Sequence, residues 1–423
     1  LHSLGRDTML SSGVEDLADE TSIWRSRGFQ AYLGSTAFSG MALAMQQLLF
    51  SWILIGILEL PADQVGLIQG LIGIPGIFLM LMGGARADSR DARRLLLQIY
   101  FLAPILPIFL VVIEQWQWLG VASVTLWGFG MGVVQSYSMP AQQAILNRVS
   151  GSAVQEGVTA ATAIGFIVQV VGLALAGQID RIGVTPVLVM QASTLLLAAL
   201  MTLRIAPMKV TPSSHNNKSS LADIRDGLQA TYRNPVVFDS LIITFISSIF
   251  NAGSFVTAFP FIVKRVYDGD ALMLAILMAI FFAGAALSNM LLLRFMPLKF
   301  PGKVFLVMQL SRVFVVFLMW IEPDFWLLVV ATVGWGLNMG VTTNLARGIV
   351  QESAESEFTG RVMAVFSIGM VGSAPIGAIL LGWVIERFGT LNALVPAMFV
   401  SVALFVYGVY FTKVWTYRSK ATL

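Results

Sequence analysis

Long runs of apolar residues, separated by short charged segments, constrain this chain more than any other feature. The segment GGARADSRDARR (83–94) carries six charged side chains, while the long runs on either side of it carry none. About 20 apolar residues are enough to cross the hydrocarbon of a membrane as a helix. Inside lipid every backbone polar group needs a partner, so runs of this length fold as helices. The sequence therefore predicts a polytopic α-helical membrane protein.

Composition agrees with this interpretation, because charged residues make up only 12% of the chain, against about 25% in soluble domains. Twelve runs are long and apolar enough to be spans. The predicted spans are 28–57, 64–84, 95–113, 118–139, 157–179, 185–204, 236–263, 271–292, 304–321, 326–346, 361–385 and 391–412.

Basic residues are distributed unequally between the two sides of these spans. Of the 26 Lys and Arg residues, 21 fall on the side of the termini, four on the other side, and Arg312 lies inside a span. Positively charged segments stay in the cytosol. We therefore expect a multi-pass protein of the cell (inner) membrane with both termini and residues 83–94 in the cytosol. Topology also explains the basic pI of about 9.2 without a nucleic-acid partner.

One long polar segment, PMKVTPSSHNNKSSLADIRDGLQATYRNP (207–235), divides the spans into two groups of six. Its first half is typical of a flexible linker. Its second half predicts an amphipathic helix that begins at Ser220 and stops at Pro235. The expected parts are an N-tail (1–27), an N-terminal bundle (28–204), a cytosolic linker (205–235), a C-terminal bundle (236–412) and a C-tail (413–423).

The two groups of spans share a weak internal repeat. GLALAGQIDRIG (172–183) ends the fifth span and GAILLGWVIERFG (377–389) ends the eleventh. WGFGMG (127–132) in the fourth span similarly matches GWGLNMG (334–340) in the tenth. Elements six spans apart are therefore alike, which predicts two pseudo-symmetric six-helix bundles with a binding site between them near the membrane midplane.

This arrangement, together with the segment after the second span, resembles the major facilitator superfamily over nearly the whole chain. Gly84, Asp88 and Arg93 fit the family signature of that loop, whereas Ser89, Asp91 and Ala92 depart from it. In the family, the Asp of this loop meets the start of the eleventh helix when the cytosolic side is closed. The resemblance therefore implies a conformational latch formed by Gly84, Asp88, Arg93 and Arg361.

Three further segments resemble an exporter branch of that family, which includes the enterobactin exporter and macrolide efflux proteins. They are MPAQQAILNRVS (139–150), IRDGLQATYRNP (224–235) and TGRVMAVFSIGMVGSAPIGAILLGWVIERFG (359–389). Thr359 stands where the branch has Arg. The fourth span lacks the proton-linked Arg of many antiporters, and the fifth lacks their Gly-Pro pair.

Polar side chains follow helical spacing along several spans. In the resembled fold, spans one, four, seven and ten line the central cavity, and these spans carry polar stripes. Such side chains also bond helices to one another, and this packing interpretation stays open for each one. The candidate substrate-binding residues are Tyr32, Ser39, Gln46, Gln135, Tyr137, Gln169, Asn251, Phe255, Trp335 and Asn338. The stripes predict a large, amphipathic, nearly uncharged cavity that suits a bulky, partly apolar solute.

Two ionisable residues are candidates for coupling or for binding a charged group of the substrate. A charge inside a membrane is costly unless it is paired, so Arg312 is either functional or held by structural partners. Asp239 lies about one turn inside the seventh span and titrates if it is desolvated.

An enzyme is not expected. Both histidines lie in polar segments, there is no Cys, and no nucleophile–base pair or metal-ligand cluster is evident. We expect neither metal nor cofactor, a monomer in the lipid bilayer, a small-molecule substrate, and protons as a candidate coupling ion. The leading hypothesis is a secondary active transporter that exports a siderophore, drug or secondary metabolite by alternating access. Uptake or lipid flipping by the same fold, and a non-transporting receptor or scaffold, are the alternatives.

Overall fold

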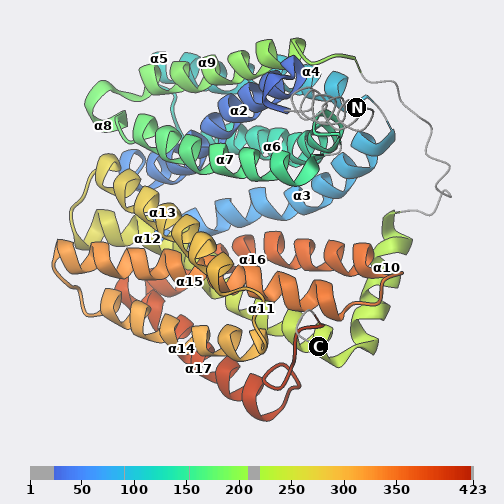
Figure 1. The fold of residues 1–423 in the computed structure, drawn as a ribbon. Coiled ribbons are helices and arrows are strands. Elements are labelled where there is room, and N and C mark those ends of the chain that lie inside the picture. Colours follow the sequence, from blue (N-terminus) through green and yellow to red (C-terminus); the bar gives the residue numbers. More distant parts are fainter. Residues whose placement is uncertain (1–22, 90, 152, 208–219, 421–423) are drawn as a thin grey trace, which may run out of the picture.

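The structure is a computed structural model that describes residues 23–420 except 90, 152 and 208–219. At 80–89, 155 and 220–224 only the backbone is described. The described residues fold into helices joined by short turns, arranged as two bundles one above the other in Figure 1.

The N-terminal half consists of six membrane-length helical segments. A short turn, η1 (Ile23–Arg25), precedes them, and Ser26 caps the first helix by accepting a bond from the amide of Phe29. The segments are α2 (Arg27–Trp52) extended by η2 (Ile53–Ile57), α3 (Ala62–Ser89), α4 (Ala92–Leu102) with α5 (Ile105–Gln115), α6 (Val121–Val149), α7 (Val154–Ala176) with the short α8 (Ile179–Ile182), and α9 (Val184–Leu203).

The C-terminal half follows the same order after the linker helix α10 (Ser220–Arg233). Its first helix has two π-helical turns, one in the middle and one at its end. The segments are α11 (Pro235–Gly253) continued by η3 (Ser254–Ala258), α12 (Phe259–Phe261) and η4 (Ile262–Val266), then α13 (Ala271–Phe295), α14 (Pro301–Trp320), α15 (Phe325–Ser353), α16 (Thr359–Phe388), and η5 (Leu391–Leu394) with α17 (Val395–Tyr410).

Eleven of these described segments have both the length and the hydropathy that a membrane span needs. The twelfth, α6, is as long as the others, but its second half carries polar residues such as Gln135 and Gln142. It packs against α2 and α3 inside the N-terminal bundle, and Gln135 on this helix lines a cavity. The predicted all-α membrane fold is therefore confirmed, with eleven described segments that meet the requirements of a span and α6 as a twelfth of similar length.

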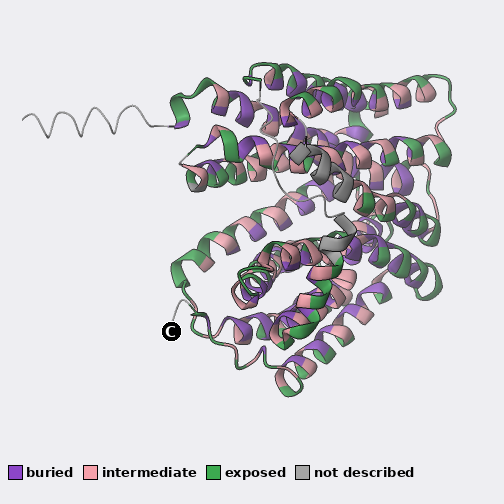
Figure 2. Ribbon diagram, turned by 90° about the vertical axis from the view of Figure 1, so that its right-hand side faces the viewer, coloured by how far each residue is buried: buried purple, intermediate pink, exposed green. Residues whose placement is uncertain are grey.

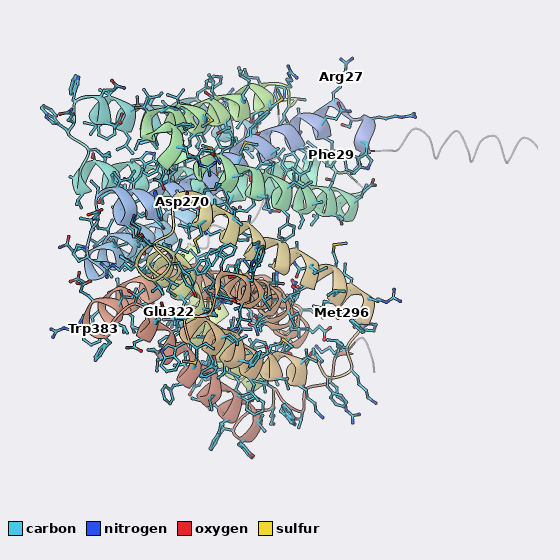
Figure 3. All side chains as sticks on the ribbon, turned by 90° about the vertical axis from the view of Figure 1, so that its left-hand side faces the viewer. Arg27, Phe29, Asp270, Met296, Glu322 and Trp383 are labelled. Carbon is cyan, nitrogen blue, oxygen red and sulfur yellow. The ribbon has the colours of Figure 1, made fainter. Side chains whose placement is uncertain are left out.

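The two ends of the bundle are distinct. One end, here called the linker end, carries Arg27, Met296 and α10, and the other, the opposite end, carries Asp270 and Glu322 (Figures 1 and 3). Figure 2 shows exposed residues along the outer faces of the helices. Large apolar side chains are among them, including Leu293 and Phe399, as expected of a surface that faces lipid.

The repeat seen in the sequence extends to the backbone of the turns at the opposite end. Glu59 and Asp268 both have positive φ, in the turns after the first helix of each half. Gly183 and Gly389, which close the two repeated motifs, have φ of 89° and 95°. Only glycine adopts such angles without strain, so the repeated glycine is a requirement of the turn.

The charged segment at 83–94 differs from the expected loop, because α3 continues to Ser89. The next helix begins immediately afterwards, at Ala92. Asp91, which departs from the family signature, is its N-cap and accepts a bond from the Arg93 amide at 3.0 Å. A cap of this kind satisfies an otherwise unpaired helix amide and lets α4 begin at Ala92, soon after α3 ends at Ser89.

Candidate functional site

A central cavity of about 280 Å³ lies between the two halves, mostly within the C-terminal half. Its walls come from α2, α11 with η3, α13, α14, α15 and α16. The lining is mixed and includes aromatic rings as well as hydroxyl, amide and guanidinium groups. Asn251, Phe255 and Arg312, all candidates from the sequence, line it together. The volume is near the lower end of the range of about 300–1,000 Å³ for small-molecule sites.

The apolar wall of the cavity is a cluster of aromatic rings around Phe255. This residue lies in the π-helical turn η3 and stacks on Phe281 with ring centroids 4.3 Å apart. Phe282 and Trp335 meet it edge to face, at 5.6 and 5.7 Å. Trp335 donates to Asn251 Oδ1 at 2.6 Å, which fixes both side chains. Offset and edge-to-face rings attract one another, so this wall is preorganised.

The polar wall is centred on Arg312 of α14, whose side chain is only 4% exposed. Its Nε and one terminal nitrogen donate to Asn338 Oδ1 at 3.3 and 3.2 Å. The other terminal nitrogen donates to Ser247 and to Gln309 Oε1. Asn338 in turn donates to Ser311 and to the carbonyl of Met308. Three helices, α11, α14 and α15, are therefore joined through one guanidinium.

The polar residues predicted in the first span lie mainly in contacts within the N-terminal half. Gln46 accepts a bond from Gln191 at 3.0 Å, and Ser39 accepts one from Gln142 at 2.8 Å. Tyr32 is 3% exposed and lies in a buried cluster of the same half. For these residues the geometry is that of the packing alternative.

Gln47, the neighbour of Gln46, is the residue of α2 that lines the central cavity. It accepts a bond from Gln169 at 3.2 Å. A second cavity of about 260 Å³ meets the first at Val256 and is lined by Gln135 of α6. Tyr137, two residues further on, is half-buried on the same helix.

Close backbone contacts join the two halves toward the opposite end. A Cβ on Gly66 of α3 would lie 2.3 Å from the carbonyl oxygen of Ala378 in α16. A Cβ on Gly73 would lie 2.3 Å from the ring of Pro375. Glycine is therefore required for α3 and α16 to approach this closely.

Two carboxylates from the repeated motifs also bridge the halves at this end. Asp180 accepts bonds from Trp52 Nε1 and from the backbone amide of Ala271, both at 2.8 Å. Ala271 is the first residue of α13, so Asp180 of one half caps a helix of the other. Glu386 has the corresponding position in its motif and accepts a bond from the amide of Ala62, the first residue of α3, at 3.0 Å. Each acid thus stabilises the positive end of a helix in the other half.

At the linker end, the residues of the implied latch lie apart from one another or outside the described side chains. Gly84 and Asp88 lie in α3, where only the backbone is described. Arg93 donates to the carbonyl of Leu203 at 2.9 Å, within the N-terminal half. Arg361, at the start of α16, forms an ion pair with Asp226 of α10 at 3.6 Å.

Asp239, the candidate coupling residue, lies in the first turns of α11 and accepts a bond from Tyr407 at 3.2 Å. The other acid near a span end, Glu114, bonds to Thr185 at the opposite end. The described lining of the central cavity includes neither carboxylate.

Several lining residues were missed by sequence reasoning. Phe281, Phe282 and Gln309 line the cavity from spans eight and nine, which the resembled family does not place at the centre. Gln309 precedes Arg312 by about one helical turn, so the spacing in the sequence indicates that both lie on the same face of the helix. Phe281 and Phe282 lie in a wholly apolar run without a distinguishing signal.

Comparison with known proteins defines the class. The sequence profile of the Major Facilitator Superfamily matches residues 32–368. No curated protein sequence matches the chain. The nucleoside transporter NupG is structurally similar with a TM-score of 0.72 at 16% identity, over 91% of this chain and 99% of that one.

Two other solved structures show the same fold. A peptide transporter POT in complex with alafosfalin has a TM-score of 0.69 at 12% identity, over 92% of this chain and 96% of that one. A bacterial homolog of the human lysosomal transporter Spinster, inward-facing and unoccupied, has a TM-score of 0.65 at 13% identity, over 92% and 96%.

The fold and the cavity between two repeated halves are thus those of a multi-pass secondary transporter. The chain belongs to the Major Facilitator Superfamily.

Proposed function

We propose that this transporter exports a partly apolar small molecule by alternating access. The observation that carries the proposal is the central cavity, which is lined by aromatic rings together with hydroxyl, amide and guanidinium groups. A site with a large apolar area and a few placed polar groups suits amphipathic solutes. The three segments that resemble the exporter branch favour export over uptake. A siderophore, drug or secondary metabolite is the proposed cargo.

We place the linker end in the cytosol, because most basic residues lie on that side. In this orientation the contacts at Gly66, Asp180 and Glu386 close the outer side, and the cavity would load from the cytosol. Closing the linker end would bring Asp88 to the start of α16, near Arg361. A carboxylate stabilises a helix N-terminus, so Asp88 would favour the state that is open to the outside.

Protons are our candidate coupling ion, and Asp239 is the candidate carrier. Its carboxyl group lies inside a span and accepts a hydrogen bond from a tyrosine. Protonation would neutralise the negative charge of this carboxylate inside the span. Asp239→Asn should then uncouple transport from the proton gradient while substrate still binds.

The decisive experiment for the function uses a deletion strain, profiled for secreted metabolites and for drug sensitivity. Export predicts lower secretion or resistance, restored by the wild-type gene but not by Asn251→Leu. Ser193→Ala, on the exposed face of α9, is the matched control and should restore both fully. Loss of growth on a nutrient would instead indicate uptake, and the absence of any phenotype would favour a receptor or scaffold.

A further inference from the structure

The charge of Arg312 is not balanced by the protein around it. Its described hydrogen-bond acceptors are Asn338, Ser247 and Gln309, all of them neutral. In the part of the chain that the structure describes, the ion pairs join other residues, and Arg312 forms none. A buried cation that is only hydrogen-bonded still lacks a counter-charge, and this costs several kcal/mol in a low-dielectric interior.

A second group beside Arg312 is also unsatisfied. Gln309 is fully buried and lines the same cavity. Its Oε1 accepts bonds from Arg312 and from Ser247, at 3.1 Å each, which fixes the orientation of the amide. Its Nε2 has no described partner. A buried donor without an acceptor is unusual and costly.

These two features point to the same kind of ligand. A guanidinium has five N–H donors, and the four bonds formed here leave one of them unused. A carboxylate or similar anion would accept from this donor and from Gln309 Nε2, and it would neutralise the charge. A neutral ligand would satisfy the donors at most, and a cation would be repelled.

The other wall of the cavity defines the rest of the ligand. Phe255, Phe281 and Phe282 line the same space, and Phe282 is the least buried of the three. An aromatic or other flat apolar group packs on such a surface with more attraction than its area alone gives. The cavity volume of about 280 Å³ favours a compact body over a large macrocycle.

We propose that the cavity binds an organic anion whose acidic group pairs with Arg312 and Gln309 and whose aromatic part packs against Phe255 and Phe282. This inference rests on the proposed transport function and names its substrate class.

Matched probes of equal size test the charge requirement. We would measure binding of 2-naphthoate and of its neutral analogue 2-naphthamide to the purified full chain by calorimetry and by thermal stabilisation. We expect 2-naphthoate to bind about tenfold tighter or more, since it alone supplies the counter-charge. Equal binding, or no binding of 2-naphthoate at millimolar concentration, would overturn the proposal.

Three variants locate the effect. Arg312→Gln should abolish the preference for 2-naphthoate, and Arg312→Lys should keep the preference with weaker binding, because Lys retains charge but loses the planar fork. Gln309→Glu places a carboxylate beside the guanidinium, so it should remove 2-naphthoate binding without lowering the unfolding temperature. Arg294→Gln, at an exposed helix end, is the control and should bind as the wild type does. A preference that survives in Arg312→Gln or Gln309→Glu would contradict the assignment.

The outcomes separate this inference from the transport function. If the deletion phenotype is rescued by the wild type and not by Asn251→Leu, while both probes bind equally, transport stands and the anion is wrong. If 2-naphthoate is preferred but deletion has no phenotype, the site binds an anion and the export function is wrong.

Discussion

The two halves of this transporter follow one plan but use their buried polar side chains differently. In the N-terminal half, amides pair with one another, as in Gln46–Gln191 and Gln47–Gln169, and the one buried oxygen of these amides without a described partner, Gln191 Oε1, lies away from the described lining of the cavity. In the C-terminal half, a cation and an unpartnered amide face a cavity. A π-helical turn, Ser254–Ala258, is also present there, whereas the matching part of α2 is regular. Such turns are frequent at functional sites.

The difference indicates how buried polar groups divide between structure and ligand. Polar groups that are paired within the protein hold helices together and need no bond from a substrate. Groups that stay unpaired are costly until a ligand arrives. On this criterion the N-terminal half is mainly scaffold at the level of the cavity, and the C-terminal half carries recognition.

The strongest test of this contrast is Asn338→Leu. The change removes the acceptor of two bonds from Arg312 and leaves the buried charge less satisfied. Because hydrogen bonds to charged groups contribute about 1.5–3 kcal/mol, we expect the free energy of unfolding to fall by about 3 kcal/mol. Thermal unfolding of the purified protein in detergent measures it. If Asn338→Leu lowered the free energy of unfolding by less than Gln191→Leu does, the contrast between the two halves would be contradicted.

Asp180 and Glu386, the two acids that bridge the halves at the opposite end, come one from each half and can be compared directly. Asp180→Asn and Glu386→Gln should each open this end, because each acid accepts a bond from the first amide of a helix in the other half, Ala271 at 2.8 Å and Ala62 at 3.0 Å. A charge at a helix N-terminus contributes about 0.3–2 kcal/mol, so we expect a population shift of several-fold. Since the chain has no Cys, spin labels at Trp118→Cys and Trp326→Cys report the distance directly. Unequal shifts would mean that one of the two acids contributes more to the closure of this end.

Asp88→Asn should shift the populations in the direction opposite to Asp180→Asn. If Asp88 holds the linker end closed, its loss should depopulate the state that Asp180→Asn favours. The effect should be smaller than that of Asp180→Asn, because we expect the segment to be solvated and charges there to be screened. The same label pair measures it, and an unchanged distance distribution with normal transport would leave residues 83–94 as a topology signal.

The smallest effect is expected for Gln191→Leu. Interhelical hydrogen bonds in membrane proteins contribute about 0.6 kcal/mol on average. The unfolding free energy should therefore fall by about that amount, and transport should be unchanged. A transport defect at normal stability would show that the N-terminal amides also serve the substrate.

Much of the fold was predictable because hydropathy and charge act locally. Span ends such as Ile57 and Ala271 follow directly from where apolar runs stop. The extension of α3 to Ser89 was not predictable, because charged residues suit a solvated helix as well as a loop. The site was harder to predict for a geometric reason. Gln46 and Gln47 differ by about 100° around a helix, and hydropathy does not show which of them faces the other half.

The glycine contacts between α3 and α16 have a mechanical consequence. They lie between Gly66 and Gly73 on one side and Pro375 and Gly382 on the other, well away from the first residue of α16, Thr359. At 1.5 Å per residue, Thr359 is about 24 Å along the helix from Pro375. A rigid tilt of about 10° around that contact would move the start of the helix by about 4 Å, while the backbones at the contact stay in touch. The contact begins near the middle of α16, so a small rotation at the sealed side displaces the start of the helix, at the linker end, by several ångströms.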